Sequence, residues 1–365
     1  MMLAAPVIER IAGRAFRFPT DAPEADGTLA WDHTTAVIAE ASAGGVSGVG
    51  YTYAAPEAAD LINTTLAEVV VGQDAFAIPS AWEAMVRRVR NLGWRGLCAT
   101  AISAVDVALW DLKARLLGRP LVQLLGATRS AVPIYGSGGF TSYSNERLAE
   151  QLARWVKQDG CQWVKMKVGS EPGQDVQRVR AARSAVGEAG LFVDANGAYD
   201  RKQALRFAEA FADLSVGWFE EPVSSDDLEG LRLLRDRAPP AMEIAAGEYG
   251  YEPFYFQRML QAGAVDVLQA DATRCGGITG FLRAAAIADV HMVPLSAHTA
   301  PALHLHVCCA VPRLRHVEWF HDHVRIERML FEGGPVPRDG LIRPDLSRPG
   351  HGLELRHADA ERFAA

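Results

Sequence analysis

The sequence lacks any run of 18 or more apolar residues, which is the length that a membrane-spanning helix needs. Cysteine is also scarce, and its five residues contain no pair in the CxxC spacing that is typical of zinc sites. They are Cys98, Cys161, Cys275, Cys308 and Cys309. An odd number of widely spaced cysteines is typical of reduced thiols. We therefore expect a cytoplasmic protein that does not associate with membranes.

There is no excess of positive charge. Lys and Arg number 37 and Asp and Glu 44, so the formal net charge is −7, which argues against nucleic acid or an anionic membrane as the main partner. A small anionic substrate is not excluded, because the charge of the site itself decides that. The 365 residues exceed one ordinary core and suffice for a barrel of about 250 residues with a smaller domain.

From about residue 131, short apolar runs alternate with longer amphipathic segments. The runs are AVPIYG, WVKMKVG, LFVDAN, VGWFEEP, MEIAAGE, VDVLQAD, HMVPLSAH and LRHVEWF. Continuous apolar runs suit strands that are buried on both faces, and helices between them require parallel crossovers. Seven of the eight runs precede a helix candidate. The pattern predicts an α/β fold with a modified TIM barrel, (β/α)₇β, over residues 131–330.

Residues 1–130 have a different pattern, which predicts an α+β capping domain. Its expected elements are a strand over Ile8–Phe18, a polar loop over Pro19–His33, a hairpin that turns at Gly44–Gly45, and a helix over Thr100–Leu117. Residues 331–365 are rich in glycine, proline and charge. We expect this C-terminal segment to pack back on the capping domain and complete it.

Each strand candidate ends in a reactive side chain. These are Ser137, Lys165 and Lys167, Asp194 and Asn196, Glu220 and Glu221, Glu248, Asp271, His298 and Glu318. From Lys167 onward they follow one another at steps of 20 to 28 residues, about one βα unit each. One such residue alone would more often cap a helix or form a salt bridge. Seven in phase indicate an active site at the C-terminal end of the barrel strands.

Three of these side chains, Asp194, Glu220 and Glu248, are carboxylates on adjacent strands. Unpaired carboxylates would repel one another and raise each other's pKa values. A hard divalent cation relieves that repulsion, and three carboxylates with open positions suit one Mg²⁺ per site. The alternative is three separate salt bridges, although a buried ion-pair cluster rarely stabilises a fold.

Candidate acids and bases flank the three carboxylates in strand order. Lys165 and Lys167 precede them, while Asp271 and His298 follow on neighbouring strands, where the carboxylate can orient the imidazole. A proton next to a carboxylate is weakly acidic, so its removal requires stabilisation of an enediolate. Mg²⁺, Lys165 and a protonated Glu318 could supply it. We expect a neighbouring lysine and the metal to lower the pKa of Lys167, so that it can act as a base.

The motifs VKMKVG, FVDANGAY, WFEEPV, AAGE, QADATRCGGITG, LSAHTAP and HVEW resemble those of the enolase superfamily, mandelate racemase subgroup. ISAVDVALWDLKARLLGRPLVQLLG resembles the last helix of that family's capping domain, so the likeness runs from about Ala99 to Trp319. It implies Asp194, Glu220 and Glu248 as metal ligands, Lys167 as base on one face, and a His298–Asp271 dyad on the other. It also implies Lys165 on the substrate carboxylate, Glu318 as electrophilic acid, and Asn196 and Ser137 as accessory contacts.

Several departures separate the chain from neighbouring subgroups. Muconate cycloisomerases and dipeptide epimerases carry a lysine at the sixth strand end, where Asp271 stands here, and typically an aspartate in place of Glu248. Enolase proper lacks the dyad that His298 would form. The mannonate-dehydratase subgroup typically lacks the Lys-x-Lys pair.

In the family, loops of the capping domain close over the substrate. Here they would be residues 19–33 and 50–55, and Trp31, His33 and Tyr53 are candidate substrate contacts. The polarity of the first loop favours a polyhydroxy acid, although exposed loops are polar by default. The resemblance implies dehydration of an acid sugar, with racemisation or epimerisation of a 2-hydroxy acid, or a catalytically silent sugar-acid-binding barrel, as alternatives. We also expect a homo-oligomer.

Some remaining residues have less specific interpretations. His321, Asp322 and His323 could bind a metal, but we expect them on a surface loop. Gly276–Gly277 could form a phosphate-binding turn before a helix, although a backbone requirement is the favoured interpretation. The paired cysteines Cys308 and Cys309 are expected to be buried.

Overall fold

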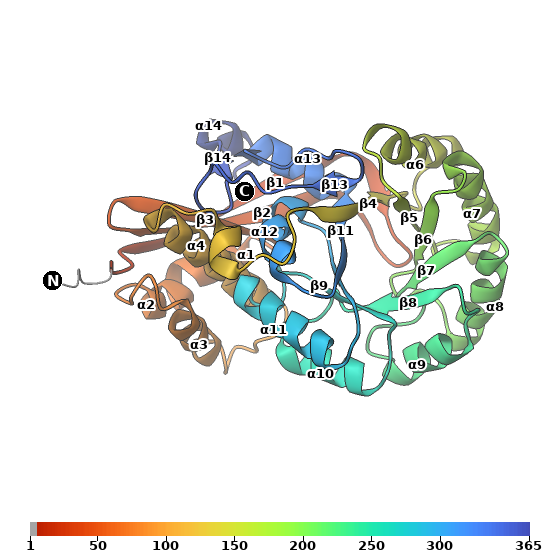
Figure 1. Ribbon diagram of the computed structural model, residues 1–365, viewed down its shortest axis with the longest axis horizontal. Coiled ribbons are helices and arrows are strands. Elements are labelled where there is room, and N and C mark those ends of the chain that lie inside the picture. Colours follow the sequence, from red (N-terminus) through yellow and green to blue (C-terminus); the bar gives the residue numbers. More distant parts are fainter. Residues whose placement is uncertain (1–5) are drawn as a thin grey trace.

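Eight parallel strands close into a barrel in the computed structural model, which describes residues 6–365 (Figure 1). The strands are β4 (Val132–Gly138), β5 (Trp163–Lys167), β6 (Gly190–Asp194), β7 (Val216–Glu220), β8 (Glu243–Ala246), β9 (Val267–Ala270), β10 (Leu295–Ala297) and β11 (Leu314–Phe320). They pair in chain order, and β11 pairs with β4 to complete the ring. The prediction of eight strands is confirmed.

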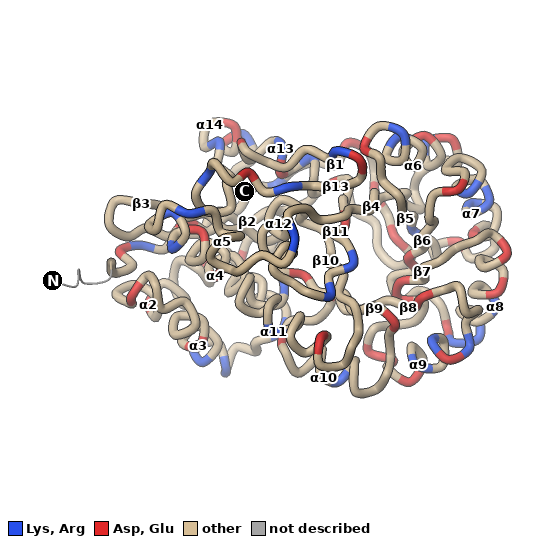
Figure 2. The backbone as a smooth tube through the Cα atoms, in the orientation of Figure 1, with Lys and Arg blue, Asp and Glu red and all other residues tan. Residues whose placement is uncertain are grey.

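Seven helices connect these strands and form the outer layer. They are α6 (Asn145–Gln158), α7 (Pro172–Val186), α8 (Arg201–Ala212), α9 (Leu228–Arg237), α10 (Pro253–Gln261), α11 (Gly277–Val290) and α12 (Pro301–Ala310). Charged residues gather on the outward side of α7, α8 and α9 (Figure 2). The (β/α)₇β architecture is thus the predicted one, with α13 (His321–Leu330) after the last strand.

Aromatic side chains fill the inside of the barrel. Phe192 stacks on Trp218 with ring centroids 5.1 Å apart, and Tyr135 meets Phe192 edge-on at 5.5 Å. Val267 and Ala245 belong to the same buried cluster. The barrel is therefore packed below its C-terminal end, and any chemistry is confined to the mouth.

The capping domain begins with a three-stranded antiparallel sheet, β1 (Arg10–Ala25), β2 (Ala30–Ala43) and β3 (Val46–Tyr53). Its helices follow as α1 (Glu57–Leu61), η1 (Ile62–Leu66), α2 (Ala67–Val70), α3 (Ile78–Arg88), α4 (Leu97–Leu116) and α5 (Leu121–Leu125). The predicted hairpin turn is confirmed, because Gly44 and Gly45 have φ values of 56° and 75°, as a two-residue primed turn requires.

The prediction of a polar loop over Pro19–His33 is wrong. Strands β1 and β2 continue through most of it, with a register shift between Pro19 and Glu24 and a turn closed by Asp26 and Leu29. Prolines are tolerated here because β1 is an edge strand of the sheet that residues 6–365 form. The tip reaches the barrel, where a Cβ on Gly27 would lie 2.4 Å from the carbonyl oxygen of Ala195.

Helix α4 docks the capping domain onto α11. The buried Asp106 accepts hydrogen bonds from the backbone N–H and hydroxyl of Thr279, at 2.9 and 2.6 Å. Gly276 and Gly277 before it have positive φ, and a Cβ on Gly277 would lie 2.3 Å from Asp106. Glycine is therefore needed at these two positions for its backbone conformation and small size. The Asp106 carboxylate occupies the N-terminus of α11, where a phosphate could otherwise bind.

The C-terminal segment contacts both domains. Strand β13 (Leu341–Ile342) pairs with β4 of the barrel, and β14 (Glu354–Leu355) pairs with β12 (Phe331–Glu332). Beyond them, α14 (His357–Ala360) and η2 (Glu361–Phe363) return to the capping sheet, where Ala364 bridges Phe16. The segment thus packs on the barrel as well as on the capping domain, while the boundaries at 130 and 330 stay predictions.

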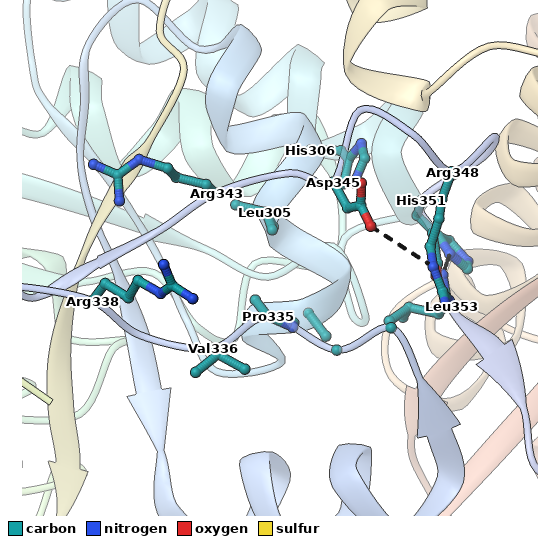
Figure 3. Close-up of a pocket in the computed structure, with 14 residues that line it drawn as sticks. Leu305, His306, Pro335, Val336, Arg338, Arg343, Asp345, Arg348, His351 and Leu353 are labelled. Carbon is teal, nitrogen blue, oxygen red and sulfur yellow. Dashed lines mark hydrogen bonds and ion pairs between the residues drawn. The ribbon is translucent and has the colours of Figure 1, made fainter.

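A cavity of about 610 Å³ lies between α12 and this C-terminal segment (Figure 3). Arg338, Arg343 and Arg348 line it, and Arg348 lies 3.8 Å from Asp345. The buried His306 at its wall accepts a hydrogen bond from the N–H of Val122. His306 thus has a structural contact, and all five cysteines are buried and free. Within residues 6–365, no helix is long and apolar enough to cross a bilayer.

Asp111 on α4 holds the C-terminal segment to the capping domain. It accepts hydrogen bonds from the backbone N–H groups of Val49 and His351, both at 2.9 Å, and from Arg115 at 2.7 Å. The carboxylate is fully buried, so these three donors replace its hydration.

We predict that Asp111→Asn lowers the free energy of unfolding by about 3 kcal/mol. The new side-chain NH₂ group would face N–H donors where a carboxylate oxygen now accepts, and Arg115 would lose its buried anion. The matched control is Asp236→Asn, which removes an exposed i,i+4 pair with Arg232 and should cost about 0.5 kcal/mol. Urea denaturation measures both. Equal losses would show that Asp111 contributes no more than a surface ion pair.

Candidate active site

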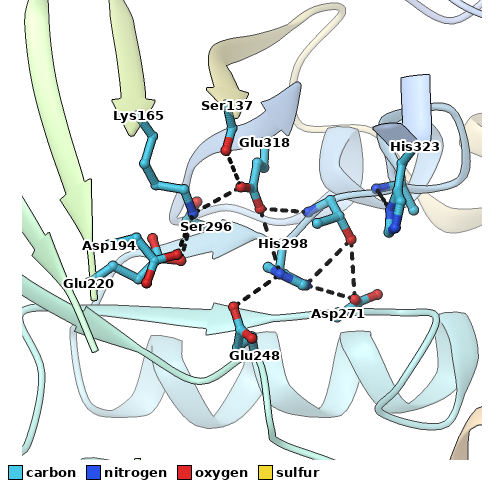
Figure 4. Close-up of polar contacts among 12 residues, drawn as sticks. Ser137, Lys165, Asp194, Glu220, Glu248, Asp271, Ser296, His298, Glu318 and His323 are labelled. Carbon is cyan, nitrogen blue, oxygen red and sulfur yellow. Dashed lines mark hydrogen bonds and ion pairs between the residues drawn. The ribbon is translucent and has the colours of Figure 1, made fainter. Parts of the chain in front are cut away.

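Three buried carboxylates meet at the C-terminal end of the barrel (Figure 4). Asp194 ends β6, Glu220 ends β7, and Glu248 follows β8; one oxygen atom of each lies within 4.8 Å of the others. Burial and the nearby Asp194 raise the pKa of Glu220 to about 8. The structure therefore brings the three predicted ligands together, and among them Glu220 is the one whose ionisation burial and Asp194 disfavour.

Lys165 lies among these carboxylates and points along the barrel axis from β5. Its Nζ atom is 2.6 Å from Glu220 Oε1 and 2.8 Å from Glu318 Oε1. The Tyr135 ring lies beneath it, with its centroid 5.4 Å away. Burial alone would lower the pKa of Lys165, but the two glutamates raise it well above its ordinary value. Lys165 is therefore a fixed positive charge.

Lys167 lies two residues farther along β5, at the side of the cluster. Its Nζ atom contacts Asp194 Oδ2 at 2.5 Å. Burial lowers the pKa of Lys167, but Asp194 raises it, and the net shift is upward even though Lys165 opposes it. The expectation of a lowered pKa is therefore not met by the protein's own groups, because the ion pair with Asp194 outweighs burial and the neighbouring lysine.

His298 lies on the other side of the cluster and forms the predicted dyad. Its Nδ1 atom is 2.9 Å from Asp271 Oδ2, and its Nε2 atom is 3.0 Å from Glu248 Oε2 (Figure 4). Burial alone would lower the pKa of His298, but Glu248 and Asp271 raise it to about 9. The imidazole thus faces the carboxylates across the cluster from Lys167.

Glu318 ends near both Lys165 and the loop after β10. It accepts hydrogen bonds from Ser137 Oγ at 2.5 Å and from the backbone N–H of Thr299 at 3.0 Å. Burial opposes its ionisation, but Lys165 and His298 lower the pKa of Glu318 to about 2. The Lys165 ammonium group beside Glu318 favours its charged form, and the role of Glu318 as an electrophilic acid stays a prediction. Ser137 therefore helps to fix the position of Glu318 through this hydrogen bond.

Backbone strain gathers at the same strand ends. Asn196, Glu221, Thr299 and Ala300 have φ values between 37° and 52°, a region that non-glycine residues seldom adopt. Each follows a strand that carries a site residue. These residues change the direction of the backbone at the mouth of the barrel. We therefore interpret their strain as a requirement for positioning the side chains of the site.

The site fits a divalent cation. Three carboxylates within reach of one point are the hard oxygen donors that Mg²⁺ prefers. Nearby, Asn196 Oδ1 and Glu221 Oε1 are buried acceptors that receive no hydrogen bond from the described residues. Both residues line a cavity of about 480 Å³ with Tyr249. These acceptors can bind donors such as hydroxyl groups or water.

The predicted substrate contacts in the capping domain separate into two groups. Trp31 lies at the mouth, edge-on to Phe140, and its Nε1 donates to Glu24 at 2.9 Å. Tyr53 stacks on His323 with ring centroids 3.5 Å apart. His33 instead contacts Asp32 and lines a surface cavity with residues 362–365. The polar side chain of His33 therefore lies at the surface rather than at the barrel mouth.

The interpretation of residues 321–323 as a surface loop is wrong for two of them. They begin helix α13, and Asp322 and His323 are buried. Asp322 accepts from Thr34 at 2.5 Å, and the Nδ1 atom of His323 accepts from the N–H of Ala300 at 3.4 Å. Contact with the capping strands explains their burial.

Arg274, near the site, was missed. Arg274 Nη1 lies 3.4 Å from Glu248 Oε1, and its Nε lies 3.7 Å from Asp271 Oδ2. Glu24 is fully buried, and burial and Asp322 raise its pKa to about 8. Arg274 stands within the QADATRCGG motif, which could have identified it. Glu24 belongs to the polar segment of residues 19–33 that was expected to contact substrate, but its burial was not predictable from the sequence, because that depends on how the capping sheet meets the barrel.

Comparison with known protein families gives two matches that together span most of the chain. Residues 147–360 match the family "Enolase C-terminal domain-like", and residues 22–126 match "Mandelate racemase / muconate lactonizing enzyme, N-terminal domain". The first match alone covers more than half of the chain.

Among curated proteins, the chain is 32% identical to 3,6-anhydro-alpha-L-galactonate cycloisomerase of Streptomyces coelicolor, over 98% of both chains. It is 34% identical to L-talarate/galactarate dehydratase of Salmonella typhimurium, over 78% of this chain and 73% of the dehydratase.

Solved structures agree. A mandelate racemase/muconate lactonizing enzyme-like protein from Rubrobacter xylanophilus is 53% identical with a TM-score of 0.96, over 99% of this chain and 100% of the other. A Streptomyces coelicolor racemase with bound magnesium is 31% identical with a TM-score of 0.92, over 98% and 100%. The phased residues at the barrel mouth, the capping domain and these likenesses agree: the chain belongs to the enolase superfamily, mandelate racemase subgroup.

Proposed function

We propose that the protein removes the α-proton of an acid sugar and then expels the β-hydroxyl as water, giving a 2-keto-3-deoxy acid. One observation carries the proposal: Lys167 on β5 contacts Asp194 and His298 after β10 contacts Glu248, so the two bases lie on either side of the carboxylates in the strand order of the barrel. A substrate carboxylate held between them would present one face to each. Several relatives are named as sugar-acid dehydratases, which supports the sugar acid as substrate class.

Asp194, Glu220 and Glu248 would hold Mg²⁺, which when bound neutralises the charge that develops on the substrate carboxylate. Lys165 supplies a second, permanent positive charge at the same place, because Glu220 and Glu318 keep it protonated. These charges stabilise the enediolate more than the ground state, as proton abstraction requires.

The two bases would divide the proton transfers. Lys167 Nζ takes the α-proton once it has given up its contact with Asp194 and lost its own extra proton to solvent, so that it is a neutral amine. His298, oriented by Asp271 through Nδ1, directs Nε2 toward the mouth and donates a proton to the departing hydroxyl. One proton is thus removed and one delivered, water leaves, and the enol product rearranges to the keto acid.

Racemisation or epimerisation is the second candidate function, with His298 or Lys167 returning a proton to the α-carbon. One observation favours it: Trp31 of the capping segment packs on the buried Phe140 and Phe320, so this part of the segment is apolar and offers no partner to a hydroxyl group. Homo-oligomerisation and a cytoplasmic location stay predictions.

The proposed reaction is tested by incubating the protein with Mg²⁺ and a library of five- and six-carbon sugar acids in D₂O. We expect a keto acid to form, detected colorimetrically and by ¹H NMR. Inversion at the α-carbon with solvent deuterium and no keto acid would instead establish the isomerase. No reaction across the library would favour a silent sugar-acid-binding barrel.

Metal dependence is the second prediction. Chelation should abolish turnover and added Mg²⁺ should restore it, because the carboxylates would otherwise repel the substrate carboxylate. Glu220→Gln should weaken Mg²⁺ binding in calorimetry as well as turnover, whereas Glu229→Gln, on an exposed helix position, should change neither. Full activity of metal-stripped protein would contradict the assigned site.

Opposed bases are the third prediction. Lys167→Ala and His298→Asn should each slow the step they serve by about 10²–10⁴-fold, the usual contribution of a positioned proton transfer. His357→Asn, at an exposed position on α14, serves as control. If His298→Asn equals the parent on the true substrate, the dyad is only structural.

A further inference from the structure

The end of capping strand β3 touches both loops that carry the dyad. Tyr51, Thr52 and Tyr53 form this end, and Tyr51 and Thr52 are fully buried. The loop after β9 carries Asp271, and the loop after β10 carries His298. Thr52 forms a hydrogen bond with the first loop, and Tyr51 forms one with the first turn of α12, the helix that follows the second loop.

Thr52 holds the Asp271 side. Its hydroxyl donates to the carbonyl oxygen of Thr273 at 2.6 Å, and the N–H of Thr273 donates to Asp271 Oδ1 at 2.7 Å. The other oxygen of Asp271 contacts His298. One residue, Thr273, thus separates the capping strand from the carboxylate that orients the imidazole.

Tyr51 holds the His298 side through the first turn of α12. Its hydroxyl accepts from the N–H of Leu303 at 3.1 Å and donates to Glu327 Oε1 at 2.5 Å, while Glu327 Oε2 accepts from the N–H of Ala302 at 3.2 Å. These N–H groups have no partner within the helix. Because α12 begins three residues after His298, the position of its first turn sets the position of the imidazole.

His304 links the two loops to each other. Its Nε2 atom accepts from the N–H of Ala272 at 2.8 Å, which makes Nδ1 the donor to the carbonyl oxygen of Thr299 at 2.9 Å. Tyr53 adds a third contact by stacking on His323, which accepts from the N–H of Ala300. The loops after β9 and β10 therefore form one unit with the end of β3.

The Lys167 side is held differently. Gly169, two residues after Lys167, donates its N–H to Asp175 at 3.1 Å, and Tyr199 donates to the same carboxylate at 2.5 Å. Both partners belong to the barrel. The capping domain meets this side through the backbone of Gly27, which packs against Val168 and Ala195. The two faces of the site thus depend on the capping domain to different degrees.

We propose that Tyr51 and Thr52 are positioning residues for the His298–Asp271 dyad, so that the capping domain holds one of the two bases while the barrel holds the other. The inference rests on the proposed two-base function. Catalytic groups must keep their geometry to about 0.5 Å, and a misplacement of about 1 Å can cost about 10²-fold in rate. Loss of either hydrogen bond should therefore impair only the half of the chemistry that uses His298.

The test compares Thr52→Val and Tyr51→Phe with Thr100→Val, a buried threonine of the capping domain whose hydroxyl donates within its own helix. The probes are D-gluconate and D-mannonate, which differ only in configuration at C2 and so present that proton to opposite faces. Exchange of each C2 proton in D₂O with Mg²⁺ is followed by ¹H NMR. His298→Asn and Lys167→Ala identify which base serves which epimer.

We expect Thr52→Val and Tyr51→Phe to slow the exchange that depends on His298 by about 10- to 100-fold, with the exchange that depends on Lys167 changed less than twofold. Thr100→Val should change neither. Equal losses in both exchanges would show a merely structural role and overturn the proposal, as would no loss in either.

If the parent exchanges neither epimer, that failure concerns the proposed function on these probes. The positioning role is then decided by crystal structures of the parent and of Thr52→Val, both with Mg²⁺. Thr52→Val is chosen because Thr52 bonds a backbone carbonyl oxygen, whereas Tyr51→Phe would leave the buried Glu327 without a donor and could fail to fold. We expect the His298–Asp271 contact to lengthen by more than about 0.5 Å while Lys167 stays in place. An unmoved dyad would overturn the proposal.

Discussion

Mutual repulsion among buried carboxylates is the constraint around which this molecule is arranged. Asp194, Glu220 and Glu248 lie within 4.8 Å at a depth that excludes bulk water. Burying such charges costs far more than a fold can supply unless cations compensate them. Lys165 and Lys167 compensate part of the charge from β5, and a divalent cation suits the remainder. The residues that would perform chemistry are thus also those that make the cluster tolerable.

Charge compensation by Lys167 reduces its strength as a base, and a bound metal ion would restore that strength. Lys167 is bound to Asp194, which favours its charged form and opposes its use as a base. A cation that took the Asp194 oxygen would compete with the ammonium group for it and remove the cause of the upward shift. Metal occupancy and base strength are therefore coupled through one carboxylate oxygen.

The sequence predicted the barrel and its mouth well because both are encoded locally. Each strand is a buried apolar run, and the ends of parallel strands converge, so phase along the chain becomes proximity in space. Roles that follow from docking were not predictable. Asp322 and His323 are polar residues after the last strand, and contacts with the capping strands contribute to their burial. The outward turn of His33 likewise depends on strand pairing through a segment whose prolines and aspartates indicate a loop.

The return of the C-terminal segment to the capping sheet has a consequence for biosynthesis. His351 Nε2 donates to the carbonyl oxygen of Val49, and the N–H of Ala365 donates to that of Ala15, partners about 300 residues and more apart. At ribosomal rates of about 5–20 residues per second, roughly 15 to 60 s separate their emergence. The barrel can begin folding on the ribosome during that interval, but the capping sheet waits for its last contacts. Its first strands therefore remain open to chaperones, or to pairing with other nascent chains, longer than any barrel strand.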